Sequence, residues 1–159
     1  MIKKYISIYS LLLFIVPLVT LIVCHQIHIN YTGIHTIPFI DGKVSVSLIG
    51  RQDYTIWIFK PGFVLYMFIS VLFYLKISNF FLLNGIKNKF KIYGVMANFF
   101  LCIYILLLGQ RDNSFYEILR RLAIIFYIAT IYINHIYLIK ILMRREFYGT
   151  VARSGYKVN

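Results

Sequence analysis

Hydrophobic positions form long runs along the chain, separated by short polar segments. The apolar runs cover residues 5–24, 57–83, 92–109 and 118–143. A membrane-spanning helix needs about 20 consecutive, mostly apolar residues. The pattern therefore predicts an all-α integral membrane protein, a four-helix transmembrane bundle that forms a single domain over residues 1–159.

One segment between the first two runs breaks this pattern. Residues 25–55 are mixed in polarity, and VSVSL (44–48) alternates apolar and polar residues as a half-buried strand does. Asp41-Gly42 is a hairpin-turn signal, and IHTIPFI (34–40) is a candidate partner strand. We therefore expect a small, partly extended extracytoplasmic cap between the first two helices.

Composition supports the membrane interpretation and changes the meaning of the charge. Only 14% of the residues are charged and the mean hydropathy is +0.77, whereas soluble domains carry about 25% charged residues. The net charge of +12 would suggest nucleic-acid binding in a soluble protein. Here the basic residues flank the apolar runs, so they indicate topology, and no nucleic-acid partner is expected.

The distribution of lysine and arginine predicts the orientation. With the N-terminus in the cytoplasm, eleven of the 17 basic residues fall on the inner side, which includes the tail, residues 144–159. Cytoplasmic segments of membrane proteins carry such an excess. Both termini are therefore expected in the cytoplasm. The low glycine and high isoleucine, lysine, asparagine and tyrosine content is typical of an AT-rich genome, and we expect a bacterial inner membrane.

Charged residues on the outer side form the first candidate site. They are Asp41, Arg51, Asp53, Lys60, Glu117, Arg120 and Arg121. Guanidinium groups match phosphate bidentately, so the set is suited to an anionic lipid head group. The favoured interpretation is that the carboxylates pair with the basic groups and pin the cap to the helix ends, as the spacing of Glu117 and Arg121 allows. Both interpretations can hold together.

Polar residues inside the spans form the second candidate. At about 1.5 Å rise per residue, they fall in the inner third of their helices; they are Ser10, Asn98, Asn134 and His135. Intramembrane polar groups are functional candidates, but asparagine and serine also bond between helices. No chain of acidic residues supplies a proton path, so an interhelical clasp is favoured.

Metal binding and catalysis receive less support. His25, His28 and His35 lie outside the bilayer and are the least favoured site, because a structural or catalytic metal needs three or four converging ligands. The sequence contains no GxSxG, no glycine-rich phosphate loop and no HExxH. We expect no cofactor and no catalytic residues, and a non-enzymatic role is favoured without being decided.

The stretch HTIPFIDGKVSVSLIGRQDYTIWIFKPGFVL (35–65) resembles the first extracytoplasmic loop and following helix of the Frag/DRAM/Sfk family. The matching positions are Pro38, Ser45 or Ser47, Gly50, Arg51 and Phe59. The family includes GPI-anchor lipid-remodelling factors and bacterial proteins of unassigned role. Its members usually have six helices, so the resemblance implies a truncated or divergent member, with a role in membrane lipid handling or regulation and no defined catalytic set.

Three functions remain open from the sequence. The leading hypothesis is a non-catalytic, lipid-interacting or regulatory polytopic membrane protein whose partners are membrane lipids. The second is an accessory or structural subunit of a larger membrane complex, because 18% aromatic residues offer extensive contact surface. The third is an extracytoplasmic metal-binding membrane protein that uses the histidines.

Overall fold

The computed structural model describes residues 2–33, 45–110 and 114–155, and all regular structure in these ranges is helical. The elements are α1 (Ile2–Thr32), α2 (Val46–Gly50), α3 (Ile56–Leu83), α4 (Phe90–Leu107) and α5 (Ser114–Gly155). Four of these helices are long and apolar enough to cross a membrane. The prediction of helical structure is confirmed for the described residues, and so is the prediction of four helices that could span a membrane.

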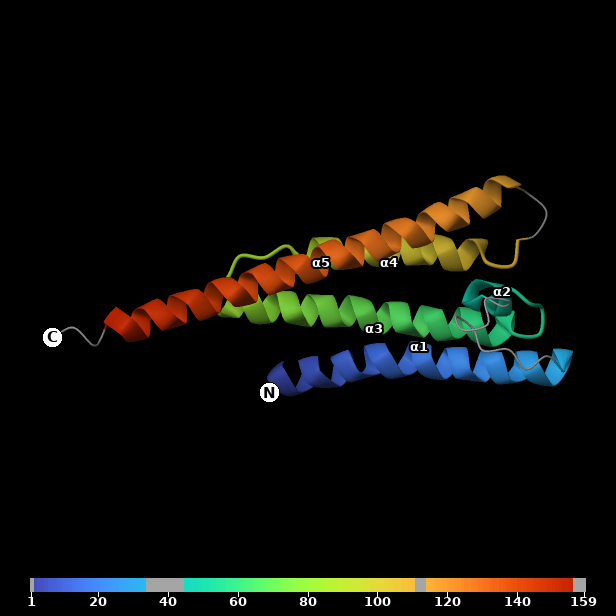
Figure 1. Ribbon diagram of the computed structural model, residues 1–159, viewed down its shortest axis with the longest axis horizontal. Helices are drawn as coiled ribbons and strands as arrows, with labels where there is room; N and C mark the ends of the chain where they lie inside the picture. Colours follow the sequence, from blue (N-terminus) through green and yellow to red (C-terminus); the bar gives the residue numbers. More distant parts are fainter. Residues whose placement is uncertain (1, 34–44, 111–113, 156–159) are drawn as a thin grey trace.

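The long helices pack in the order of the chain. Helix α1 packs on α3, α3 on α4, and α4 on α5, while α2 contacts α1 and α3. The start of α1 and the C-terminal end of α5 both point away from the end that carries α2, and α5 extends well beyond the start of α1 (Figure 1). Side chains join α3 to α5 directly, because the hydroxyls of Tyr66 and Tyr127 are 2.8 Å apart.

Glycine residues end two of the long helices. Gly33 follows α1 with φ of 68°, and Gly85 follows α3 with φ of 71°. This left-handed conformation is open to glycine at little steric cost and is common just past a helix C-terminus. The Gly33 amide donates to the Ile29 carbonyl at 2.8 Å, which closes the last turn of α1.

Two hydrophobic clusters lie inside the helix array. The larger one is at the α2 end and joins α1, α2, α3, α4 and α5 through Cys24, Ile49, Phe59, Leu101, Tyr104, Ile105, Leu108 and Ala123. The smaller one, formed by Ile77, Phe81 and Phe90, joins α3 and α4 at the opposite end. Many large apolar side chains outside these clusters are exposed, which suits helices whose outer faces contact lipid.

The described part of the cap is helical, so the predicted extended structure is wrong there. Residues 46–48 of the expected strand lie in α2, whose N-cap Ser45 accepts a hydrogen bond from the Leu48 amide at 3.1 Å. Val46 and Ile49, three residues apart, both pack on the larger cluster. That spacing is helical, whereas a strand would have placed alternate residues on one face. Residues 34–44, with the expected turn and partner strand, lie outside the described ranges.

The helix bounds also differ from the apolar runs. Helix α1 continues through His25 to Thr32, and α5 continues through the expected tail to Gly155. Helix α1 continues past its apolar run because the same face of the helix stays buried there. Cys24, at the end of the run, and His28, four residues later, are both buried. An apolar run marks the part of the chain that can lie in lipid, whereas a helix can extend beyond the ends of that run.

Candidate functional site

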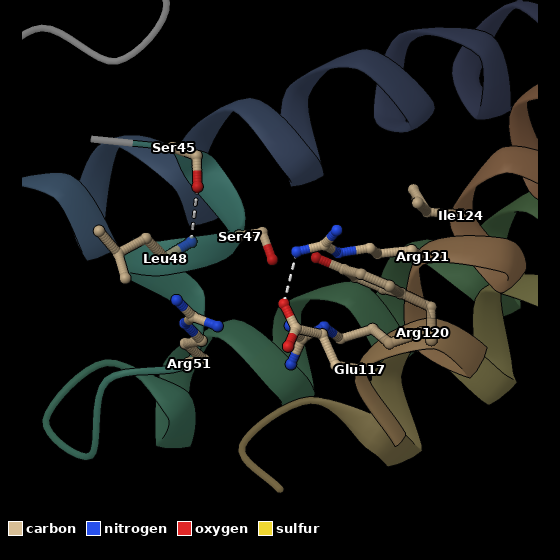
Figure 2. A pocket seen from close by; sticks show the side chains of 9 residues that line it. Ser45, Ser47, Leu48, Arg51, Glu117, Arg120, Arg121 and Ile124 are labelled. Carbon is tan, nitrogen blue, oxygen red and sulfur yellow. Dashed lines mark hydrogen bonds and ion pairs between the residues drawn. The ribbon is translucent and has the colours of Figure 1, made fainter. Parts of the chain in front are cut away.

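A cavity of about 320 Å³ lies between α2 and the first turns of α5. We call it the arginine pocket. Its lining residues are Ser45, Ser47, Leu48, Arg51, Tyr104, Glu117, Arg120, Arg121 and Ile124. Figure 2 shows Arg51 on the α2 side and the Glu117, Arg120 and Arg121 side chains on the α5 side, with the Ser47 hydroxyl between them. Residues far apart in the sequence therefore meet in one cavity.

Short-range contacts hold the α2 wall of the pocket in place. The Thr55 hydroxyl is buried and donates to the carbonyl of Ile49, at the end of α2. Gly50 lies against the Phe59 ring, where an added Cβ would come within 2.6 Å of the ring carbons. These contacts fix the turn that carries Arg51, which is the C-cap of α2. Arg51 is itself engaged in a further interaction.

Arg120 forms the buried part of the pocket. Only 7% of its surface is exposed, and within the described ranges no hydrogen bond or ion pair reaches its guanidinium group. It lies one turn from Ala123 of the larger cluster. A buried charge is normally paired, because moving a charge out of water is costly. Arg120 is therefore the unusual group of this site.

Arg121 and Glu117 form the exposed rim. The Arg121 Nη2 atom donates to Glu117 Oε1 at 2.5 Å, and the two side chains are 71% and 47% exposed. They are four residues apart on α5, the spacing at which helical side chains meet. An exposed pair of this kind contributes about 0.2–1 kcal/mol. Arg120 takes no part in this ion pair.

The other expected members of the outer charged set lie elsewhere. Asp53 is exposed in the turn before α3 and has an interaction of its own. Lys60 is half-buried on α3 and does not line the pocket. Asp41 lies outside the described residues. Sequence reasoning did not place Ser45, Ser47 and Tyr104 at this site, because hydropathy does not show which segments lie beside the start of α5.

The intramembrane polar residues do not form one cluster. Asn98 Nδ2 donates to Ser70 Oγ at 3.1 Å, which links α4 to α3, and to the Gly94 carbonyl at 2.7 Å. Asn134 is buried and lies beside Tyr74 of α3, but neither its Nδ2 nor its Oδ1 atom forms a hydrogen bond with a described residue. Asn98 thus has the interhelical bond expected of a clasp.

Ser10 and His135 face away from that bond. Ser10 is exposed and lines a wide apolar groove between α1 and α3 that reaches Leu138 of α5. His135 is exposed and its Nδ1 atom is 2.9 Å from the Ile131 carbonyl, one turn back on the same helix. Neither residue contributes to the link between α3 and α4.

The histidines near the end of α1 have a structural environment. His28 is buried, and its Nδ1 atom is 2.8 Å from the Tyr54 hydroxyl. Burial, with a smaller effect of Tyr31, raises the pKa of Tyr54 above its ordinary value, so the hydroxyl stays protonated. His25 is half-buried on the same helix, and His35 lies outside the described residues. Among the residues described, no three His, Cys, Asp or Glu side chains are grouped to hold a metal.

Comparison with known proteins gives no relative. No family model matches the chain, and neither a curated protein nor a solved structure matches it. Any function must therefore be argued from the geometry of the arginine pocket.

Proposed function

We propose that this chain is a non-catalytic integral membrane protein that binds an anionic lipid head group in the arginine pocket. The observation that carries the proposal is Arg120, a nearly buried residue that lines a cavity and has no ion pair among the described residues. A phosphate in the cavity would supply that counter-charge. Arginine suits the task because its planar fork binds two phosphate oxygens at once.

The lining of the pocket suits an amphiphile better than a free ion. Arg51, Arg120 and Arg121 make one part polar, while Leu48 and Ile124 add apolar side chains from the two walls. Ile124 lies within the part of α5, Ser114–Ile141, that is long and apolar enough to cross a membrane. A lipid can place its phosphate among the arginines and its chain along this apolar side.

The proposal includes an orientation. The pocket is lined in part by α2, which lies far from the C-terminal end of α5 (Figure 1), and the excess of basic residues near the termini favours a cytoplasmic location for them. The head group would then belong to the outer leaflet of a bacterial inner membrane. This is a role of the kind implied by the resemblance to the Frag/DRAM/Sfk family, which itself remains a prediction.

Cysteine labelling tests the orientation. In a chain with Cys24 and Cys102 replaced by serine, Ser114→Cys at the start of α5 should react in intact cells with a membrane-impermeant maleimide. Lys87→Cys, which is exposed between α3 and α4, should react only after the cells are opened. The reverse pattern would place the arginine pocket on the cytoplasmic side.

Lipid-dependent stability tests the binding itself. The full chain in neutral detergent should gain apparent melting temperature when phosphatidic acid or phosphatidylglycerol is added, since a ligand that binds only the folded state stabilises it. At a lipid concentration of about 100 times Kd the gain is about 2.7 kcal/mol. Phosphatidylcholine with the same acyl chains is the control. Equal gains from all three lipids would contradict a charge-selective site.

A further inference from the structure

We infer that the lipid bound in the arginine pocket is a phosphodiester whose head group carries hydroxyl groups, as in phosphatidylglycerol. The inference rests on the proposed function and specifies the ligand class of the same site. It follows from Glu117, a hydrogen-bond acceptor in the lining of a cavity that is otherwise suited to phosphate. A head group that donates hydrogen bonds can use this acceptor, whereas a phosphate without such a group is repelled by it.

The charge of the pocket matches a ligand with one negative charge. Arg51 is engaged in a further interaction, and Arg121 forms an ion pair with Glu117. Arg120 is only 7% exposed and has no ion pair among the described residues. One positive charge therefore remains for the ligand, and a phosphodiester carries one negative charge. A phosphoethanolamine head group is neutral overall, and its ammonium group would lie close to arginine side chains.

Glu117 has acceptor capacity beyond its ion pair. Its Oε1 atom accepts from Arg121 Nη2 at 2.5 Å, and a carboxylate has two oxygens with about four lone-pair sites. Figure 2 shows the Glu117 side chain pointing from α5 toward the α2 wall, on which Ser47 lies. The Ser47 hydroxyl can also accept a hydrogen bond. The phosphate of a phosphodiester has no O–H group, so only the head-group substituent can donate to these acceptors.

The spacing of Glu117 and Arg120 explains why a donor is needed. The two residues are three apart on α5, so their side chains are neighbours on the helix surface. A phosphate bound to the Arg120 guanidinium group therefore lies beside the Glu117 carboxylate, and two anionic groups repel each other. A head-group hydroxyl between them supplies the donor. The diacylglycerol substituent can then follow the apolar side chains of Leu48 and Ile124.

The experiment compares phosphatidylglycerol with phosphatidylpropanol of identical acyl chains. Both lipids are phosphodiesters with one negative charge, and only phosphatidylglycerol has head-group hydroxyls. Binding of each is measured on the full chain in neutral detergent by native mass spectrometry at neutral pH. We expect phosphatidylglycerol to bind about tenfold more tightly, a difference of about 1.4 kcal/mol, close to the value of one hydrogen bond with a charged acceptor.

The variant Glu117→Gln separates the acceptor from the charge of the site. The amide removes the repulsion and leaves Arg121 without its ion pair, so phosphatidylpropanol should bind more tightly to the variant than to the unmodified protein. The preference for phosphatidylglycerol should fall, because a neutral amide oxygen is a weaker acceptor than a carboxylate. Tyr116→Phe is the control, since it removes an exposed hydroxyl next to Glu117 that does not line the pocket. An undiminished preference in Glu117→Gln would contradict the role of Glu117.

Each alternative result has a definite meaning. Equal binding of phosphatidylglycerol and phosphatidylpropanol, both above phosphatidylcholine, would overturn the head-group inference and leave the proposed lipid site standing. Binding of phosphatidylethanolamine as tight as that of phosphatidylglycerol would assign Glu117 to an ammonium group, which also overturns the inference. Binding of no anionic lipid above phosphatidylcholine would overturn the proposed function. Competition by glycerophosphoglycerol as strong as that by phosphatidylglycerol would show a site for a soluble diester and would overturn the lipid role.

Discussion

Replacement of Arg120 by methionine is expected to raise the apparent melting temperature in neutral detergent and to abolish stabilisation by anionic lipid. Arg120 is only 7% exposed and has no ion pair among the described residues, so in the absence of ligand its charge opposes folding. Methionine keeps most of the apolar stem and removes the charge. Replacement of buried ionic groups by apolar residues can stabilise proteins by about 1–4 kcal/mol. For a chain of this size, 1 kcal/mol corresponds to about 2–4 °C.

The two interpretations of the outer charges differ in the sign of this effect. If Arg120 pins the cap to the helix ends through a carboxylate, Arg120→Met should lower the melting temperature, because it leaves the partner charge unpaired. If Arg120 instead binds a ligand, Arg120→Met should melt at a higher temperature than the unmodified protein in the absence of lipid, and added lipid should not change the melting temperature of the variant. The measurement is a thermal unfolding scan with and without phosphatidic acid. Lys140→Met is the control, because Lys140 is exposed on the same helix.

Replacement of Gly94 by leucine is expected to destabilise the contact between α3 and α4 by about 1–3 kcal/mol, the usual cost of overpacking. Gly94 is buried, and a Cβ at this position would lie 2.4–2.6 Å from three carbon atoms of Tyr74. The Gly94 carbonyl also accepts a hydrogen bond from Asn98. Small residues are common where membrane helices approach closely, and a larger side chain would force α3 and α4 apart.

A double-mutant cycle isolates this contact. Gly94→Ala and Tyr74→Ala should each lower the apparent melting temperature. The double variant should lose less than the sum of the two, because the clash with the ring carbons disappears and only the clash with the Cβ atom of residue 74 remains. Val95→Leu is the control, since Val95 is adjacent in sequence and 49% exposed. Additive losses in the double variant would show that the ring of Tyr74 does not limit the approach of the helices.

The sequence predicts the number of spans well because hydropathy reports the solvent in which a helix can sit. It predicts the angular position of side chains poorly. Arg120 and Arg121 are adjacent and were grouped together, yet one is 7% exposed as a residue and the other has a side chain that is 71% exposed. Neighbours on a helix point about 100° apart, and the packing of α5 on α4 decides which of the two is buried.

The same distinction explains the intramembrane polar residues. Rise per residue places Ser10 and Asn98 at similar depth, but α1 packs on α3 and α2 and not on α4. Depth alone therefore grouped residues that the helix order separates. To predict the hydrogen bond from Asn98 to Ser70, one must know that α3 packs on α4, and hydropathy does not give that information.

Helix α5 has 42 residues, which corresponds to about 63 Å at 1.5 Å per residue. Arg120 and the terminal turns at Gly155 thus belong to one continuous rod, and α4 supports that rod only over the length of Phe90–Leu107. A rod supported along part of its length behaves as a lever. A tilt of α5 at the arginine pocket would swing the far end of the helix through a wider arc, so a small movement at the pocket becomes a larger displacement at the opposite end of α5.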